Sequence, residues 1–389
     1  MSLEPSATPW DLRVSPPLTV GILSTYPPTA CGLATFSAAL ASGLEARGAQ
    51  VRVVRVSDGC PSASDLVVGE LDNGRPASVA AAADLLNQCD VAIVQHEYGV
   101  YGGIDGDEVV EILGSLRVPS IVIAHTVLSE PTAHQRSVLV EVASLADRMV
   151  VMSGAARERL RGGFDVGIEK IDTIPHGAAV PPPRSSSSPD PRRPTLLTWG
   201  LVGPGKGIER VIDAMSHLHK LSARPRYLVA GSTHPKVLAA DGESYRNARI
   251  EQAWRNGVAA SVEFDADYRD VSTLTTMIQS CAAVVLPYDS RDQATSGVLV
   301  DAIAAGRPVI ATAFPHAVEM LASGAGIIVD HDDPDAMVDA LTGLLTDPVR
   351  ASRMAAEASR LAPNLGWPVV AGAYLELADR LLLDRAALV

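Results

Sequence analysis

Short runs of β-branched and other apolar residues alternate along the chain with segments that have the apolar spacing of helices. In the first half, the apolar runs predict buried strands at 18–24, 51–56, 91–95, 120–124 and 149–152, and the helical segments lie at 33–47, 78–89, 107–116 and 132–145. Strands that alternate with helices are typical of βαβ units, in which helices cover both faces of a parallel sheet. The first half is therefore predicted to form a Rossmann-like domain.

A second series of the same kind follows a segment rich in proline and serine. This segment reads VPPPRSSSSPDPRRP from Val180 and cannot contribute to an apolar core, so we interpret residues 181–194 as a linker. Beyond it, strands are predicted at 195–199, 226–230, 261–264, 283–286, 309–312 and 326–329. A last apolar helix near 367–383 has no strand after it, and we expect it to pack back on the first domain.

The predicted fold class is α/β, with two doubly wound, Rossmann-like domains that face each other across a cleft. The first domain is predicted to comprise residues 1–180 together with 367–389, and the second residues 195–366. Ligands of open parallel sheets bind beyond the carboxyl ends of the strands. The cleft between the two sheets is therefore the expected site.

Composition limits the classes of function. The 389 residues, 47% of them apolar, are enough for the cores of two or three domains. A net charge of −13 argues against nucleic acid as a partner, since phosphate binding needs a basic face. The four cysteines lie at no metal or redox spacing. No secretory signal and no apolar run of about 20 residues is recognisable, so we expect a cytoplasmic protein without an integral membrane segment, and leave a homodimer open.

The segment QATSGVLVDAIAAGRPVIAT, from Gln293 to Thr312, predicts a loop, a short helix and a buried strand. Gly297 lets the first amides of that helix approach a ligand closely, and helix N-termini attract anions such as a diphosphate. Asp301 follows at a spacing where its carboxylate can accept hydrogen bonds from sugar hydroxyls. Together, the loop, the helix and the acid indicate a site for a nucleotide sugar.

A glycine-rich loop, GLVGPGKG, runs from Gly200 to Gly207 after a predicted strand. It nearly matches a Walker A loop, but Gly207 stands where that loop needs a hydroxyl residue to hold Mg²⁺. A P-loop NTPase therefore stays open only as an alternative, and Lys206 remains a candidate phosphate ligand. The loop that follows the first strand and ends at Gly32 does not have the G-x-G-x-x-G pattern of dinucleotide-binding loops. An NAD(P)-dependent oxidoreductase is therefore not favoured.

Histidines and acids end two strands of the first domain. His96, Glu97 and Tyr98 follow one strand in QHEYGVYGG, and His125 ends the next one. Residues of these types at strand ends fit the wall of a cleft. Each histidine taken alone is as readily explained as a structural, buried residue.

Two acidic clusters have the composition of metal sites but a simpler explanation. The cluster DHDDPD at 330–335 precedes a predicted helix, where Asp333 or Asp335 is well placed to cap the helix. The cluster DAD at 265–267 lies in a loop between a strand and a helix. We assign no metal to either cluster.

From about residue 18 to 383, these motifs resemble the GT-B glycosyltransferases, specifically the retaining enzymes of glycosyltransferase family 4. That family usually reads E-G-F-G-x-x-x-x-E-A-x-A-x-G-x-P-V-I-A, where this chain has Gln293 and Asp301 at the two acid positions. The family loop G-R-x-x-x-x-K-G aligns with Leu201 and Lys206, so one cation is missing. Candidates to replace that cation are Arg291, His234 and Lys236.

The resemblance implies retaining, metal-independent transfer of a hexose from a nucleoside-diphosphate sugar to a hydroxyl of a carbohydrate or glycoside. It favours GDP-mannose as donor, and therefore a mannosyltransferase, with UDP-glucose as the alternative donor. No cofactor is implied beyond the donor substrate. A homologue that binds a nucleotide sugar without turning it over stays open, because of these departures from the family pattern.

The same resemblance assigns roles to individual residues. The implied catalytic residues are His125, Lys206 and Gln293. The implied donor-binding residues are Gly32, Gly205, Tyr268, Ser296, Gly297, Val298 and Asp301. The implied acceptor-side residues are His96, Glu97 and Tyr98. In this scheme Lys206 and the helix amides would stabilise the leaving diphosphate, Asp301 would hold the ribose, and His125 would lie near the C6 hydroxyl of the sugar.

Overall fold

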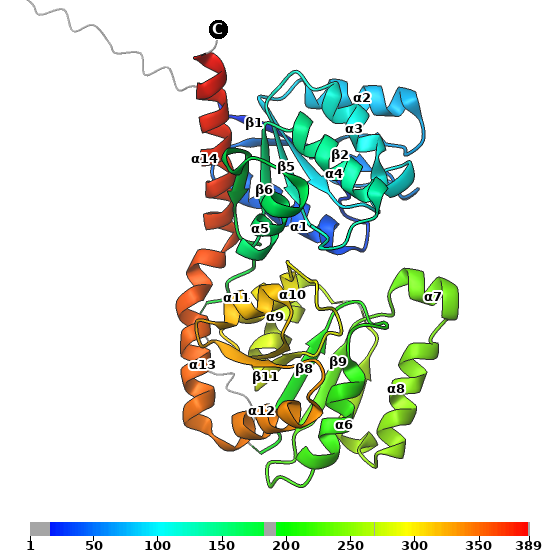
Figure 1. Ribbon diagram of the computed structural model, residues 1–389, viewed down its shortest axis with the longest axis vertical. Helices are drawn as coiled ribbons and strands as arrows, with labels where there is room; N and C mark the ends of the chain where they lie inside the picture. The colour runs from blue at the N-terminus through cyan, green and yellow to red at the C-terminus, as the bar shows by residue number, and fades with distance from the viewer. Residues whose placement is uncertain (1–15, 183–191, 268, 388–389) are drawn as a thin grey trace, which may run out of the picture.

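The computed structural model describes residues 16–182, 192–267 and 269–387, which form two lobes (Figure 1). The strands of the N-terminal lobe are β1 (Thr19–Ser24), β2 (Gln50–Val56), β3 (Val67–Leu71), β4 (Val91–His96), β5 (Ser120–Ala124), β6 (Arg148–Val151) and β7 (Ile171–Thr173). Those of the C-terminal lobe are β8 (Thr195–Trp199), β9 (Arg226–Ala230), β10 (Val262–Asp265), β11 (Ala283–Leu286), β12 (Val309–Thr312) and β13 (Gly326–Val329).

Each lobe is built on one parallel sheet. Within the described residues, the strand order is β3-β2-β1-β4-β5-β6-β7 in the N-terminal lobe and β10-β9-β8-β11-β12-β13 in the C-terminal lobe. Both orders reverse direction at the first strand of the lobe, as doubly wound sheets do. The prediction of two Rossmann-like sheets is therefore confirmed.

Helices cover both faces of each sheet. The N-terminal lobe carries α1 (Gly32–Glu45), α2 (Pro76–Leu86), α3 (Glu108–Gly114), α4 (Ala133–Leu145) and α5 (Gly154–Phe164). The C-terminal lobe carries α6 (Ile208–Leu218), α7 (Pro235–Asp241), α8 (Ser244–Arg255), α9 (Val271–Ser280), α10 (Gly297–Ala304), α11 (Pro315–Leu321), α12 (Pro334–Thr346) and α13 (Pro348–Leu361). The last helix is α14 (Trp367–Ala386), and short 3₁₀ turns lie at Ile104–Gly106, Ile168–Lys170, Ala259–Ser261 and Ala362–Leu365.

The core of each lobe forms two apolar layers, one on each face of its sheet. Along β4, Ile93 packs into one layer and Val94 into the other, and both side chains are fully buried. The strand is buried at every position, which explains why it reads as a continuous apolar run rather than as an alternating one.

The chain crosses between the lobes at two neighbouring places. After β7, the Ala178 amide donates to the Leu365 carbonyl oxygen at 2.7 Å, next to the point where the chain returns as α14. Helix α14 then packs along α1, where a Cβ on Gly43 would lie 2.9 Å from the Cβ of Ala371 (Figure 1). The predicted return of the last helix to the first lobe is confirmed, whereas the domain boundaries drawn from the sequence stay a prediction.

None of the helices in the described part of the chain is long and apolar enough to cross a membrane.

Candidate active site

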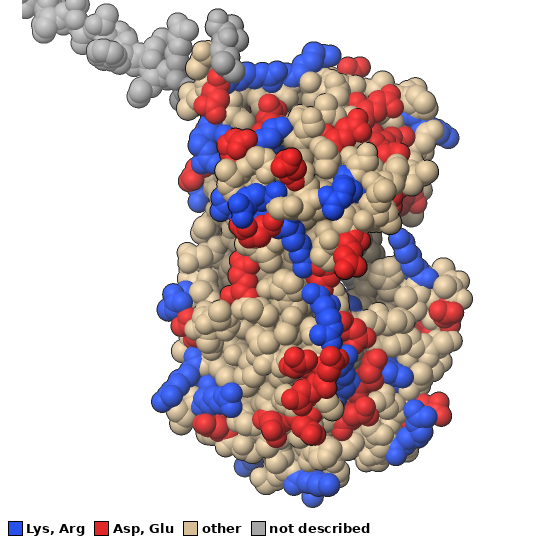
Figure 2. All heavy atoms as spheres, viewed as in Figure 1, with Lys and Arg blue, Asp and Glu red and all other residues tan. Residues whose placement is uncertain are grey.

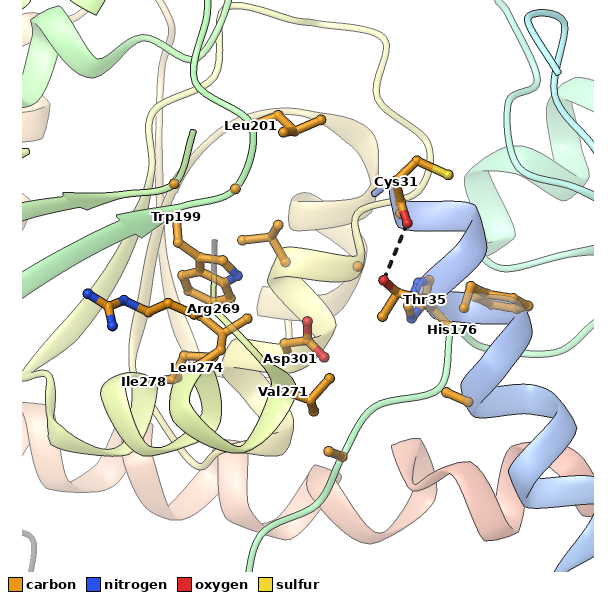
Figure 3. A pocket seen from close by; sticks show the side chains of 18 of the residues that line it. Cys31, Thr35, His176, Trp199, Leu201, Arg269, Val271, Leu274, Ile278 and Asp301 are labelled. Carbon is orange, nitrogen blue, oxygen red and sulfur yellow. Dashed lines mark hydrogen bonds between the residues drawn. The ribbon is translucent and has the colours of Figure 1, made fainter. Parts of the chain in front are cut away.

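A cavity of about 630 Å³ lies between the carboxyl ends of the two sheets. Gly32, His125 and His176 of the N-terminal lobe line it, together with Lys206 and Asp301 of the C-terminal lobe. Figure 3 shows His176 and Asp301 in this wall. The molecular surface is correspondingly hollowed between the lobes (Figure 2). A second cavity of about 200 Å³ adjoins the first and shares two lining residues with it, His125 and Thr295.

The N-terminus of α10 faces the larger cavity. Ser296 caps this helix, because its hydroxyl accepts from the Leu299 amide at 3.3 Å. The Ser296 amide donates to Nδ1 of His316 at 2.8 Å, so it is not free to bind an anion, in contrast to the role expected for it. Gly297 and Val298 line the cavity, and no acceptor for their amides lies among the described residues. The free amides at this helix end are therefore those of Gly297 and Val298.

Gly297 is required by the packing at this helix end. A Cβ there would lie 2.9 Å from Nε2 of His176, a side chain of the opposite lobe. The imidazole and the helix N-terminus are thus in direct contact across the cleft, which only a glycine permits without displacing the ring.

Lys206 supplies a positive charge to the cavity wall. It lies in the loop between β8 and α6, and its Nζ is 4.5 Å from the centre of the Tyr288 ring. No carboxylate of the described residues forms an ion pair with it. Gly207 follows at φ 63°, where a Cβ would be 1.7 Å from the Pro287 carbonyl oxygen. Glycine is therefore needed for the turn that presents the lysine.

Leu201 also lines the cavity, so the position of the family arginine is apolar here. Of the three candidates to replace that cation, only His234 is among the described residues that line the cavity. Arg291 pairs with Asp332 at 2.7 Å on the surface. Lys236 reaches toward the other lobe, where its Nζ would lie 3.8 Å from a Cβ on Gly99.

Asp301 projects its carboxylate from α10 into the cavity, toward Thr35 and His176 (Figure 3). Burial among uncharged neighbours raises the pKa of this carboxyl from 3.8 to about 7. Within the described residues, no hydrogen-bond donor contacts its side-chain oxygens. The carboxylate is thus an unused acceptor that a ligand with hydroxyl groups can satisfy.

His125 is a neutral hydrogen-bonding group in the wall that the two cavities share. Its Nε2 lies 2.5 Å from Oε1 of Gln95, so in this orientation of Gln95 it is Nε2 that carries the proton, and Nδ1 can accept. Burial, followed by the neighbouring His176 and His96, lowers the pKa of His125 to about 3. At neutral pH the ring therefore carries no charge.

The sequence prediction missed an aromatic part of this wall. The ring of His176 lies 5.0 Å from that of Phe36 and 6.0 Å from that of Trp367, and burial lowers its pKa to about 4. Trp199, at the carboxyl end of β8, also lines the cavity. His176 follows β7 in the segment IPHGA. The sequence feature that could have found it is the one that led to His125, namely a histidine at the end of a strand.

The three residues expected on the acceptor side are not among the described residues that line either cavity. His96 is 1% exposed, and neither ring nitrogen has a partner within the described residues. The Glu97 carboxylate accepts from the Thr126 hydroxyl at 2.5 Å and from the Tyr98 amide at 3.0 Å, and burial raises its pKa. The tyrosine ring packs edge-on against His96, at 5.1 Å.

The remaining predicted site residues lie at the edges of the two cavities or outside the described residues. Gln293 lines the smaller cavity, and its side-chain amide donates to the Thr295 carbonyl oxygen at 3.1 Å. Gly205 is not among the lining residues, and its carbonyl oxygen accepts from the Asp289 amide at 3.0 Å. Tyr268 falls outside the described residues.

Both acidic clusters have structural roles. The Asp333 carboxylate caps α12 by accepting from the Ala336 amide at 2.9 Å, and Asp265 forms an ion pair with Arg269. In the described part of the chain, no group of three or more His, Cys, Asp or Glu side chains could hold a metal ion.

Two family profiles cover the two lobes. The profile described as Glycosyltransferase Family 4 matches residues 30–180, and that described as Glycosyl transferases group 1 matches residues 193–347. The chain belongs to glycosyltransferase family 4 and has the GT-B fold. Family membership accounts for the paired sheets, the cleft between them and the final helix that returns to the first lobe.

Curated relatives and solved structures agree with this assignment. The chain is similar to the D-inositol 3-phosphate glycosyltransferases of Kineococcus radiotolerans (28% identity, covering 64% of this chain and 60% of that one) and Rhodococcus opacus (27%, 64% and 56%). The aligned region thus spans less than two thirds of either relative. Sucrose-phosphate synthase from Thermosynechococcus elongatus shares the fold (TM-score 0.74, 17% identity, covering 94% of this chain and 100% of that one). Anabaena HepE in complex with UDP and glucose shares it too (0.72, 15%, 93% and 100%).

Proposed function

We propose that this protein is a retaining hexosyltransferase that acts on a nucleoside-diphosphate sugar and a hydroxyl of a carbohydrate or glycoside, without a metal ion. The observation that carries the proposal is the interlobe cavity whose walls contain the free amides of Gly297 and Val298, Lys206 and Asp301. These groups match the diphosphate and the ribose of a nucleotide sugar. A cytoplasmic location and a homodimer stay predictions.

GDP-mannose is the donor that we propose first, on the branch of the family that the sequence motifs resemble. UDP-glucose is the alternative, and the complex of Anabaena HepE with UDP and glucose supports a uridine nucleotide in this fold. The wall formed by Trp199, Leu274 and Ile278 is apolar enough to receive either base.

The chemistry that we propose exchanges two bonds at the anomeric carbon on one face of the sugar. The bond from that carbon to the diphosphate oxygen breaks, the bond to the acceptor oxygen forms, and the acceptor proton passes to the diphosphate. Lys206 and the two helix amides would stabilise the charge that develops on the leaving group. The neutral His125 would accept a hydrogen bond from a sugar hydroxyl at Nδ1, and Gln293 would contact the transferred sugar from the smaller cavity.

The charges of the cavity walls favour an uncharged acceptor. The described residues that line the two cavities include one lysine, Lys206, and one arginine, Arg269. Both belong to the C-terminal lobe. Arg269 is neutralised by Asp265. The relatives are named for a phosphorylated acceptor, inositol 3-phosphate, whereas the N-terminal wall described here has no cation for a phosphate.

A thermal-shift panel tests this function. GDP-mannose, UDP-glucose, ADP-glucose, ATP with Mg²⁺, and NAD are each added to the protein, and any compound that stabilises it is then tested for transfer to neutral and phosphorylated acceptors. We expect one nucleotide sugar to raise the melting temperature, because stabilisation grows with occupancy of the folded state. Stabilisation by ATP or NAD alone would contradict the proposal, and a bound sugar nucleotide without product would indicate a homologue that only binds.

The binding of the donor is expected to depend on pH through Asp301. The pKa of its carboxyl is about 7 in the empty cavity, and hydrogen bonds from ribose hydroxyls favour the ionised form. The dissociation constant of the sugar nucleotide should therefore be constant above about pH 8 and rise as pH falls below 7, by at most about tenfold per pH unit. Calorimetry with GDP-mannose or UDP-glucose measures it, because their diphosphate does not titrate in this range.

The Asp301→Asn variant is the control for this pH dependence. Its binding should be weaker than that of the wild type at pH 8 and nearly independent of pH. A variant with the same pH profile as the wild type would assign the dependence to another group.

A further inference from the structure

The first backbone amides of helix α5, in the N-terminal lobe, donate hydrogen bonds to a carboxylate of the other lobe. The carboxylate of Glu319, on α11, accepts from the amides of Gly154 at 2.9 Å and Ala155 at 3.1 Å. Figure 1 shows α5 directly above α11 at the junction of the lobes. Helix N-termini attract carboxylates through their free amides and their dipole. These two amides therefore keep this partner only while the lobes are in contact.

The same helix reaches the loop that precedes α10. Arg159 forms an ion pair with the Asp292 carboxylate at 2.7 Å and also donates to the Asp292 carbonyl oxygen at 2.6 Å. The hydroxyl of Ser153, the N-cap residue of α5, donates to the carbonyl oxygen of Ala294 at 2.6 Å. Donors of the N-terminal lobe thus hold the C-terminal-lobe loop on both sides of Gln293.

The loop held in this way leads directly to the anion-binding amides. The Ser129 amide of the N-terminal lobe also donates to the Asp292 carboxylate, at 3.2 Å. Toward the other end of the loop, His316 of the C-terminal lobe donates its amide to the Gln293 carbonyl oxygen at 3.3 Å and accepts from the Ser296 amide. Thr295 lines both cavities between these two points. The path of residues 292–296 is consequently fixed by one lobe at its start and by the other at its end.

We propose that Arg159, Ser153 and Glu319 form an interlobe latch with Asp292, Ala294 and the first amides of α5. The latch completes the donor site when the lobes close. Arg159, Ser153 and Glu319 line neither cavity and are positioning residues, which act through Gln293 and the Gly297 and Val298 amides. An open arrangement of the lobes frees the loop, so closure and correct geometry at the leaving group are coupled. This inference rests on the proposed sugar transfer for its kinetic consequence.

Two substitutions test the latch. Arg159→Met keeps the apolar stem of the side chain and removes its donors, and Glu319→Gln keeps the shape and removes the charge. We expect kcat for sugar transfer to fall about tenfold in the first variant, which corresponds to 1.4 kcal/mol. In the second it should fall about threefold. The dissociation constant of the donor and the melting temperature should change little.

Arg161→Met is the matched control, because Arg161 lies on the same helix and, among the residues that the structure describes, its ion-pair partner is the exposed Glu158 at 2.7 Å. It should retain the kcat of the wild type. The double variant with Arg159→Met and Asp292→Asn should lose no more activity than the less active of the two single variants, since both remove the same contact. A control as impaired as Arg159→Met, or fully additive losses in the double variant, would overturn the latch.

Small-angle scattering tests the latch without turnover. The radius of gyration with saturating UDP or GDP, whichever binds, should be larger in Arg159→Met and Glu319→Gln than in the wild type and in Arg161→Met. Equal radii for all four proteins would refute the latch. A wild type that transfers no sugar from any donor would instead refute the proposed function, and the radii would still decide whether the latch exists.

Discussion

Replacement of Lys206 with alanine is expected to lower the rate of sugar transfer by about 10²–10³-fold, the usual cost of removing one group that stabilises charge in a transition state. Lys206 is the cavity-lining cation in the described residues that has no carboxylate partner. Leu201 stands at the position of the family arginine, so no guanidinium at that position can compensate for the loss of the Lys206 charge. Initial rates at saturating donor measure the effect.

Lys220→Ala is the matched control, because Lys220 is an exposed lysine beyond the end of α6 and does not line the cavity. Both variants should melt at the temperature of the wild type. Wild-type turnover in Lys206→Ala would assign the leaving group to a different part of the cleft.

Replacement of Asp301 with asparagine is expected to weaken donor binding and to stabilise the free protein at the same time. Binding should weaken by about 10–100-fold at pH 8, since hydrogen bonds from hydroxyls to a charged acceptor contribute about 1.5–3 kcal/mol. The free protein should become more stable because the wild type holds an unpartnered carboxylate in the cavity wall, where burial disfavours its ionised form.

The stability effect has a defined sign with pH. The pKa of Asp301 is about 7 in the folded protein and 3.8 ordinarily, so the folded state binds the proton more tightly than the unfolded state. The free energy of unfolding of the wild type therefore falls as pH rises from about 4 to about 7. Asp301→Asn should exceed the wild type by about 1–4 kcal/mol at pH 8, because a pKa difference of one corresponds to about 1.4 kcal/mol. The gain should shrink toward pH 5.

Urea denaturation at pH 5 and pH 8 measures this difference, with Asp379→Asn, on the exposed face of α14, as the control. If Asp301→Asn lost stability at pH 8, the carboxylate would have a stabilising partner in solution.

The central strands could be predicted because they are buried on both faces. The expected strand at 120–124 coincides with β5. Five of the six strands expected in the second half match the observed bounds, as β8 at 195–199 does, and the sixth is displaced by one residue. The edge strands β3 and β7 were not predicted. β3 alternates between partly exposed and exposed positions, and β7 has only three residues, so neither forms an apolar run.

Candidate residues that line the cavity could be named from the sequence where a single segment contains them. Gly297, Val298 and Asp301 come from one helix, and Lys206 from one loop, so local sequence was sufficient to bring them forward as candidates for the cavity wall. The engagement of the Ser296 amide depends on His316, which lies 20 residues later, and no local pattern indicates it.

Contacts between the lobes could not be predicted for the same reason. Gly154 and Glu319 are 165 residues apart, and their hydrogen bond exists only because the two lobes meet. The expected acceptor-side residues failed to line the cavity because a strand end specifies a sheet edge but not the direction of each side chain. His96 ends β4 with its ring buried in the lobe, whereas His125 one strand away lines the cleft.

The packing of α14 on α1 has a consequence for biosynthesis. Val370, Tyr374 and Leu377 of α14 complete the apolar layer that Ile22 and Leu40 begin. When a ribosome has translated the first 180 residues, this layer still has one side open to water. The N-terminal lobe therefore cannot close until α14 has been translated, and a fragment that ends before α14 should associate or be captured by chaperones unless the missing helix is supplied as a separate peptide.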